Sequence, residues 1–168
     1  MQSMLRLYEK QFGRYPFHKD GFTIMESLYP MEHQGAVSVG YFNEPFFSDK
    51  CDTAGIIRLA WHEAAHEWWG NNISCKDNAD IWFHEAFATY AEILCLEIFK
   101  GRDAMVKYLR EQKPGNSSTL IGHYDVNDFH LGDVYSKGSR LVYMLRQIIN
   151  NEKKWQGLLR RLQQHFRH

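Results

Sequence analysis

The sequence has few of the features that mark disulfide-rich, membrane-spanning or nucleic-acid-binding proteins. Its three cysteines, Cys51, Cys75 and Cys95, form neither a CxxC pair nor an even framework, so we expect small buried apolar residues. No apolar run reaches the ~18 residues that span a bilayer, and the longest candidate, residues 93–99, is interrupted by Glu97. Basic and acidic residues are equal at 20 each, so no strong field attracts nucleic acid. These absences exclude a membrane segment and argue against a nucleic-acid partner.

The N-terminal segment also lacks an uninterrupted apolar stretch. Charged residues are mixed among the apolar ones in residues 1–10, so we expect no signal peptide, and the sequence indicates no compartment. The 168 residues are 44% hydrophobic and 15% aromatic, enough for one ordinary core. We find no internal repeat or linker, and therefore expect a single domain over residues 1–168.

The spacing of apolar residues predicts an α+β domain that is mainly helical. Two runs rich in β-branched and aromatic residues, at 22–29 and 36–42, predict a small edge sheet near the N-terminus, with Pro30 and Gly35 separating the strands. Helical periodicity marks six separate segments, and residues 114–118 are expected to form a loop. The expected helices are the first dozen residues, 54–69, a run from Asp80 to residue 98, 103–112, 134–149 and 153–166.

The helix expected at 54–69 contains the motif H-E-x-x-H, with His62, Glu63 and His66. Residues four apart lie within roughly 40° of each other around a helix and about 6 Å apart along it, so both imidazoles face one point. One metal ion can bind both. Glu63 lies one step round the helix, where a general base can reach metal-activated water.

A catalytic zinc site needs a third protein ligand, and Glu85 is the natural candidate. Eighteen residues, 67–84, separate it from His66, and it lies in the first turns of the next predicted helix. The alternative is that the two histidines are capped or core residues and that Glu63, Glu67 and Glu85 are exposed helix charges. That alternative is weakened because apolar residues surround the histidines and Glu85, where unpaired polar groups are costly. These neighbours are Trp61, Ala64, Ala65, Trp68, Phe83, Ala86 and Phe87.

With these residues, the sequence resembles the aminopeptidase N family of zinc peptidases, in the thermolysin-like gluzincin group. HEAAHEWWGN at 62–71 is similar to the family's HExxHxWFGN block, and DIWFHEAFATYAE at 80–92 to its DLWLNEGFATYxE block. YSKG at 135–138 matches the family's YxKG segment, and MEH at 31–33 stands where the family has G-x-M-E-N. The blocks occur in the family's order over roughly positions 5–150.

The resemblance implies a thermolysin-like catalytic domain that binds one Zn²⁺ ion through His62, His66 and Glu85. It implies that Glu63 acts as base and then acid, and that Tyr135 stabilises the oxyanion together with zinc. It further implies that Glu32, with Met31 beside it, binds the free α-amine of a peptide substrate. A phenol such as that of Tyr135, placed near the metal, can contribute about 3 kcal/mol to transition-state binding.

Several positions depart from the family pattern. His33 replaces the asparagine of G-x-M-E-N and Tyr29 its glycine, which affects the strand edge expected to line the substrate. His84 stands where the family has an asparagine before the third ligand, so it is expected to affect how His66 is oriented. Ala86 replaces the following glycine, whereas Thr89 agrees with the family and is expected to support a ligand through its hydroxyl.

Family members usually carry an N-terminal β-rich domain and a C-terminal helical domain around this segment. We therefore expect the chain to be a core fragment without those flanking domains. The expected reaction is zinc-dependent hydrolysis of N-terminal peptide bonds. Alternatives are an endopeptidase or epoxide hydrolase on the same scaffold, or a zinc-stabilised module without turnover.

Overall fold

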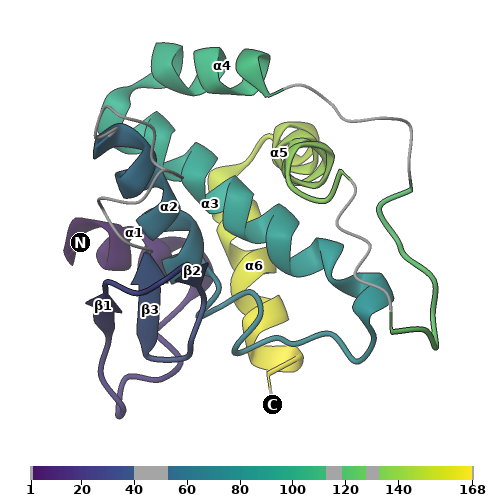
Figure 1. Ribbon diagram of the computed structural model, residues 1–168. Helices are drawn as coiled ribbons and strands as arrows, with labels where there is room; N and C mark the ends of the chain where they lie inside the picture. Colours follow the sequence, from purple (N-terminus) through teal and green to yellow (C-terminus); the bar gives the residue numbers. More distant parts are fainter. Residues whose placement is uncertain (1, 40–52, 113–118, 128–132, 168) are drawn as a thin grey trace.

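The computed structural model describes residues 2–39, 53–112, 119–127 and 133–167. It is mainly helical, with a small sheet packed near the first two helices (Figure 1). The described helices are α1 (Gln2–Phe12), α2 (Thr53–Ala65), α3 (Trp82–Lys100), α4 (Arg102–Glu111), α5 (Ser136–Ile149) and α6 (Glu152–His165), and a short 3₁₀ helix, η1 (Asn78–Asp80), precedes α3. The expected α+β, mainly helical architecture is confirmed.

The sheet has three described strands, β1 (Thr23–Met25), β2 (Pro30–Met31) and β3 (Ala36–Val39), in the order β1-β3-β2. β1 runs parallel to β3, and β2 pairs antiparallel to β3 with Met31 opposite Ser38. The strand predicted over 22–29 is present but shorter, as β1, whereas the predicted break at Pro30 was wrong, because Pro30 begins a strand of its own. Proline is tolerated there because β2 lies at the sheet edge, where its missing N–H costs no ladder bond. Residues 40–42 of the second predicted strand lie outside the described residues.

α2 ends four residues earlier than predicted, at Ala65. The backbone then forms a wider turn, in which hydrogen bonds join residues five positions apart. They run from the Asn71 amide to the His66 carbonyl and from the Ile73 amide to the Trp68 carbonyl. Wide turns of this kind often occur at functional sites. Gly70, with φ at +145°, closes the turn.

Two polar side chains after α2 hold the sheet against this turn. Glu67, fully buried, accepts from the Gly35 amide at 2.7 Å and from the Tyr15 hydroxyl at 3.1 Å. Asn71 donates its side-chain amide to the carbonyl of Glu32 at 2.9 Å. The end of β2 is therefore fixed beside the H-E-x-x-H segment.

α3 is the central helix, and it packs against α2, α4 and α5. Its start differs from the predicted one at Asp80, because Asp77 caps η1 by accepting from the Ala79 amide at 2.8 Å. A cap of this type satisfies an amide that no helical bond could use. α3 itself begins two residues later, at Trp82.

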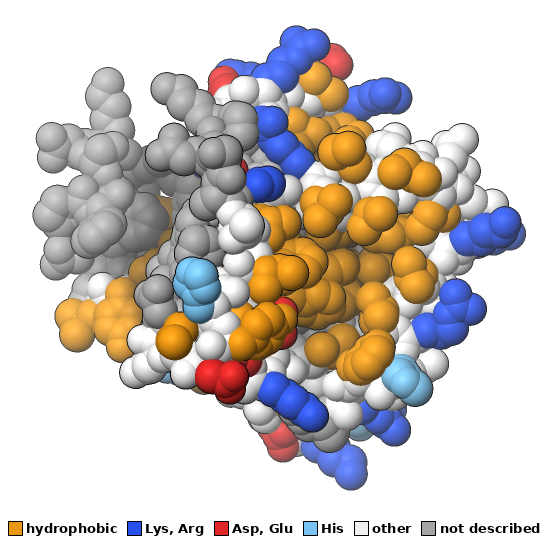
Figure 2. Space-filling model, turned by 90° about the vertical axis from the view of Figure 1, so that its right-hand side faces the viewer, with side chains coloured by type: hydrophobic (Ala, Val, Ile, Leu, Met, Phe, Trp, Pro, Cys, Tyr) orange, Lys and Arg blue, Asp and Glu red, His pale blue; other side chains and the backbone are white. Residues whose placement is uncertain are grey.

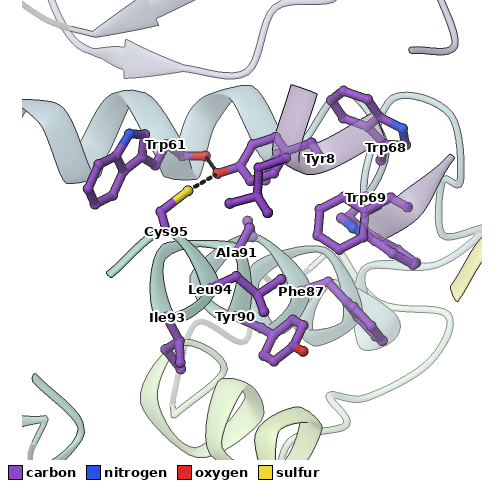
Figure 3. Packing of buried hydrophobic residues seen from close by; sticks show 14 of the residues in the cluster. Tyr8, Trp61, Trp68, Trp69, Phe87, Tyr90, Ala91, Ile93, Leu94 and Cys95 are labelled. Carbon is purple, nitrogen blue, oxygen red and sulfur yellow. Dashed lines mark hydrogen bonds between the residues drawn. The ribbon is translucent and has the colours of Figure 1, made fainter. Parts of the chain in front are cut away.

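The hydrophobic core lies between α1, α2, α3 and α6, with large aromatic side chains at its centre (Figure 3). Tyr8 donates its hydroxyl to the carbonyl of Trp61 at 2.7 Å, and Cys95 donates its thiol to Tyr8 at 3.5 Å. The buried position expected for Cys95 is confirmed. Cys75 is only half-buried, contrary to expectation, and Cys51 lies outside the described residues.

One face of the molecule carries many hydrophobic side chains (Figure 2). Four of the exposed apolar residues follow helical spacing on α5, namely Leu141, Met144, Leu145 and Ile148. In the described parts of the chain, no helix is both long and apolar enough to cross a membrane.

Candidate metal centre and substrate cavity

Three side chains from two neighbouring helices converge where the sequence predicts the metal. His62 and His66 come from α2 and the turn after it, and Glu85 comes from the first turn of α3. The Nε2 atoms of the two histidines are 3.2 Å apart, and Glu85 Oε2 lies 3.1 Å from His62 Nε2 and 3.6 Å from His66 Nε2. Their ligand atoms all lie within 4.8 Å of one another.

This spacing fits a tetrahedral zinc ion. Ligand atoms at zinc bond lengths of 2.0–2.2 Å lie roughly 3.3–3.6 Å apart in a tetrahedral site, close to the separations found here. Two imidazole nitrogens and one carboxylate are also a donor set typical of catalytic zinc, which leaves one position for solvent or substrate. The side chains are almost enclosed, with 10% of His62, 2% of His66 and 12% of Glu85 exposed. The residues present therefore fit a zinc ion.

The far ring nitrogen of His62 is held by a second carboxylate. His62 Nδ1 lies 2.9 Å from Glu92 Oε1, and the other oxygen of Glu92 accepts from the Tyr108 hydroxyl at 2.9 Å. Burial disfavours the charged ring, but the hydrogen bonds to Glu85 and Glu92 outweigh burial and raise the pKa of His62 to about 10. A carboxylate behind a ligating histidine fixes its tautomer and strengthens its metal bond.

His66 is held differently, by the main chain. Its Nδ1 lies 3.0 Å from the carbonyl oxygen of Trp69, which the wide turn after α2 directs back at the ring. Gly70 follows at once, and a Cβ there would lie 3.4 Å from His66 Nδ1. The turn and the glycine together aim Nε2 of His66 at the ligand cluster.

Glu63 and Glu32 form a second acidic group beside the cluster. Ligand atoms of Glu32, Glu63 and His66 also lie within 4.8 Å of one another. Burial raises the pKa of Glu63 to about 7, against the opposing effect of His62 and His66. A carboxylate that can both take up and release a proton near neutral pH suits a general base and acid.

These side chains line a cavity of about 900 Å³. Met31 and Glu32, at the end of β2, line this cavity, as do Tyr135 and Ser136, where α5 begins. The Tyr135 ring lies 5.9 Å from the His62 ring between centroids. Burial and the nearby charges of Glu85, Glu63 and Glu32 raise the pKa of Tyr135, so its hydroxyl stays a proton donor.

Among the described residues, neither His84 nor Thr89 forms a hydrogen bond to a proposed metal ligand. His84 Nε2 accepts from the Cys75 amide at 3.0 Å, and the partner of His66 is the Trp69 carbonyl. Thr89 lines the cavity, but its buried hydroxyl oxygen has no partner among the described residues. Support of a ligand by either residue stays a prediction.

Sequence reasoning missed several residues that the structure places at the site. Glu92 is seven positions after Glu85, which puts both on one face of a helix, so a spacing signal was present. Asn71 is the last residue of the HEAAHEWWGN block, but the sequence indicated no role for it. Arg58 and Tyr108, which also line the cavity, have no motif signal, because the position of α4 depends on tertiary packing.

Comparison with known proteins agrees with this geometry. The family model described as "Peptidase family M1 domain" matches residues 1–168. The chain is 26% identical over 183 residues to endoplasmic reticulum aminopeptidase 2 of Homo sapiens, covering 95% of this chain and 18% of the relative. It is 28% identical to aminopeptidase N of Streptomyces lividans, covering 89% of this chain and 20% of the relative. It thus spans about a fifth of these relatives' length.

Two solved structures share the fold. The M1 zinc metallopeptidase of Deinococcus radiodurans superposes with a TM-score of 0.72 at 25% identity, over 98% of this chain and 36% of that one. Native leukotriene A4 hydrolase of Saccharomyces cerevisiae gives 0.78 at 20% identity, over 99% and 29%. The match of the family description to the whole chain, on a fold shared with an M1 zinc metallopeptidase, shows that the chain belongs to peptidase family M1.

Proposed function

We propose that this chain is the zinc-binding catalytic core of an aminopeptidase, which hydrolyses the N-terminal bond of a peptide. The observation that carries the proposal is the convergence of His62, His66 and Glu85, at zinc-ligand separations, beside the buried Glu63. The resemblance to aminopeptidases supports the choice of reaction.

His62, His66 and Glu85 would hold the ion. When bound, zinc acts as a Lewis acid that polarises the scissile carbonyl and acidifies water. Glu92 and the Trp69 carbonyl keep the two imidazoles oriented, so the donor atoms are preorganised before an ion arrives.

Glu63 moves the proton in the proposed mechanism. Its carboxylate removes a proton from the attacking water and then delivers it to the leaving amine. It is 7% exposed, so little bulk water competes for that proton. Tyr135 donates its hydroxyl to the carbonyl oxygen as negative charge develops there, which stabilises the transition state.

Glu32 supplies the selectivity for a free N-terminus. Its carboxylate lies beside Glu63 and His66 and pairs with the substrate's ammonium group. An internal or acetylated peptide bond has no cation to offer. The bound amine places the first peptide bond, rather than a later one, next to Glu63.

The test compares variants of the zinc-loaded full-length protein. Glu63→Gln should keep one equivalent of zinc and lose about 10²- to 10⁴-fold in kcat, because only the proton acceptor is removed. His66→Ala should lose both zinc and turnover. Metal analysis with an aminoacyl-amide assay measures both effects. A Glu63→Gln protein with wild-type turnover would overturn the mechanism.

A second comparison separates the aminopeptidase from an endopeptidase on the same scaffold. The enzyme should cleave a peptide with a free amine and reject its N-acetylated form. Glu32→Gln should raise KM for the free-amine peptide. Equal cleavage of both peptides would refute the role given to Glu32, and stoichiometric zinc without any hydrolysis would favour a non-catalytic module.

A further inference from the structure

Arg58 places a positive charge in the cavity that the proposed mechanism leaves unused. It lies on α2 four residues before His62, so it occupies the same face of the helix as His62 and His66. It lines the same cavity as they do. Among the described residues of that lining, it is the only lysine or arginine.

The guanidinium of Arg58 is held in place by an aromatic ring, and no carboxylate of the described residues forms an ion pair with it. Its central carbon lies 5.6 Å from the ring centroid of Tyr108, a cation–π contact. The hydroxyl of Tyr108 is bound to Glu92, which fixes the ring beneath the guanidinium. Within the described ranges, Arg58 forms no ion pair, so its planar set of donors remains available to a ligand.

Arg58 and Glu32 lie on opposite sides of the metal ligands. Glu32 is grouped with Glu63 and His66, toward the end of α2. Arg58 is about 6 Å before His62 along the helix axis and about 12 Å before His66, at 1.5 Å per residue. The cavity therefore has Glu32 at one end, the ligand cluster in the middle and Arg58 at the other end, where Glu92 is already bonded to His62 and Tyr108.

A short peptide has the matching charge order. With its ammonium group at Glu32 and its first peptide bond at the ligand cluster, its second residue extends toward Arg58, at ~3.5 Å per residue. A carboxylate at that position can accept two parallel hydrogen bonds from the guanidinium. The cavity already holds four carboxylates, Glu32, Glu63, Glu85 and Glu92, so an anionic group needs this cation as its partner.

We propose that Arg58 binds a substrate carboxylate on the leaving-group side of the scissile bond, an inference that rests on the proposed aminopeptidase function. That carboxylate belongs either to the C-terminus of a dipeptide or to an acidic side chain of the second residue. The preferred substrates are accordingly anionic on this side rather than neutral or basic.

The test measures binding, so that it does not depend on turnover. It uses zinc-loaded full-length protein with Glu63→Gln and calorimetric titration of two matched pairs. Leucyl-alanine against leucyl-alaninamide tests the C-terminal carboxylate, and leucyl-glutamyl amide against leucyl-glutaminyl amide tests the acidic side chain. The carboxylate member of at least one pair should bind about tenfold more tightly. The pair that shows the preference identifies its source.

Adding Arg58→Gln should bring that ratio to about one, and Arg58→Lys should give an intermediate ratio, because lysine keeps the charge but loses the planar donors. Arg102→Gln removes an equal charge from an exposed position on α4 and should leave the ratio unchanged. A ratio at or below one for both pairs before Arg58 is changed, or a ratio that survives Arg58→Gln, overturns the proposal. Hydrolysis of leucyl-p-nitroanilide by protein with Glu63 intact tests the aminopeptidase function separately.

Discussion

Glu92→Gln should weaken zinc binding without removing any of the three proposed ligands. Glutamine nearly preserves the shape of the side chain, but it replaces the carboxylate that lies 2.9 Å from His62 Nδ1 with a neutral amide. That amide can also present its NH₂ group to the ring and stabilise the wrong tautomer. His62 would then hold the metal with a less basic and less firmly oriented ring.

The size of the effect follows from the burial of the pair. Glu92 and His62 have only 12% and 10% of their side chains exposed, so water replaces the lost interaction poorly. Loss of such a partner behind a metal ligand typically lowers metal affinity 10- to 100-fold, or about 1.4–2.7 kcal/mol. Tyr108→Phe removes the hydrogen bond from Tyr108 to Glu92. It should weaken zinc binding by less than about fivefold, because Tyr108 is only half-buried.

The assay is competition for zinc against a chromophoric chelator, with circular dichroism to check the fold. Glu97→Gln is the matched control, because Glu97 is another α3 carboxylate in a charged pair, 2.6 Å from Arg146 on α5. It should lower stability but leave zinc affinity unchanged. If Glu92→Gln is folded and binds zinc as tightly as the wild type, Glu92 does not support His62 and the reasoning is refuted.

Two further predictions concern protons and packing. The hydrogen bonds to Glu85 and Glu92 raise the pKa of His62 to about 10 in the metal-free chain, so the ring is protonated at pH 8. Zinc binding should then release about one proton, which calorimetry measures as a binding heat that depends on the ionisation enthalpy of the buffer. Binding heats that are independent of the buffer would contradict this. Gly138→Ala should lower the free energy of unfolding by about 1–3 kcal/mol, because the new Cβ would lie 2.7 Å from the Ala86 Cβ where α5 meets α3. Gly157→Ala on α6, with open space around it, should instead raise the free energy of unfolding by about 0.5–1 kcal/mol, and equal effects in denaturant titrations would refute the packing argument.

The proposed metal ligands were predictable because their spacing is local. Four residues of helix relate His62 to His66, and Glu85 follows in the next helix, so periodicity and residue chemistry sufficed. The wide turn after Ala65 was not predictable, since apolar periodicity continues through Trp69 while the backbone leaves the helical path. The strand at Pro30 was missed for a similar reason, because proline is excluded from a central strand but not from an edge.

The long-range contacts of the site lie beyond local patterns altogether. Arg58 and Tyr108 are fifty positions apart and meet only because α4 folds back over α2 and α3. Asn71 donates to the Glu32 carbonyl across a separation of 39 positions in the sequence. Such pairs depend on how the helices pack, which no single stretch of sequence specifies.

The different supports of His62 and His66 give the two imidazoles unequal mutational freedom. Single substitutions at Glu92 or Tyr108 can adjust the first in graded steps, so its basicity is open to tuning. The second relies on a peptide carbonyl, which no side-chain exchange can delete. Substitutions that adjust the basicity of the ligands should therefore accumulate around His62. Substitutions near Gly70 would instead change the backbone path, and with it the orientation of His66.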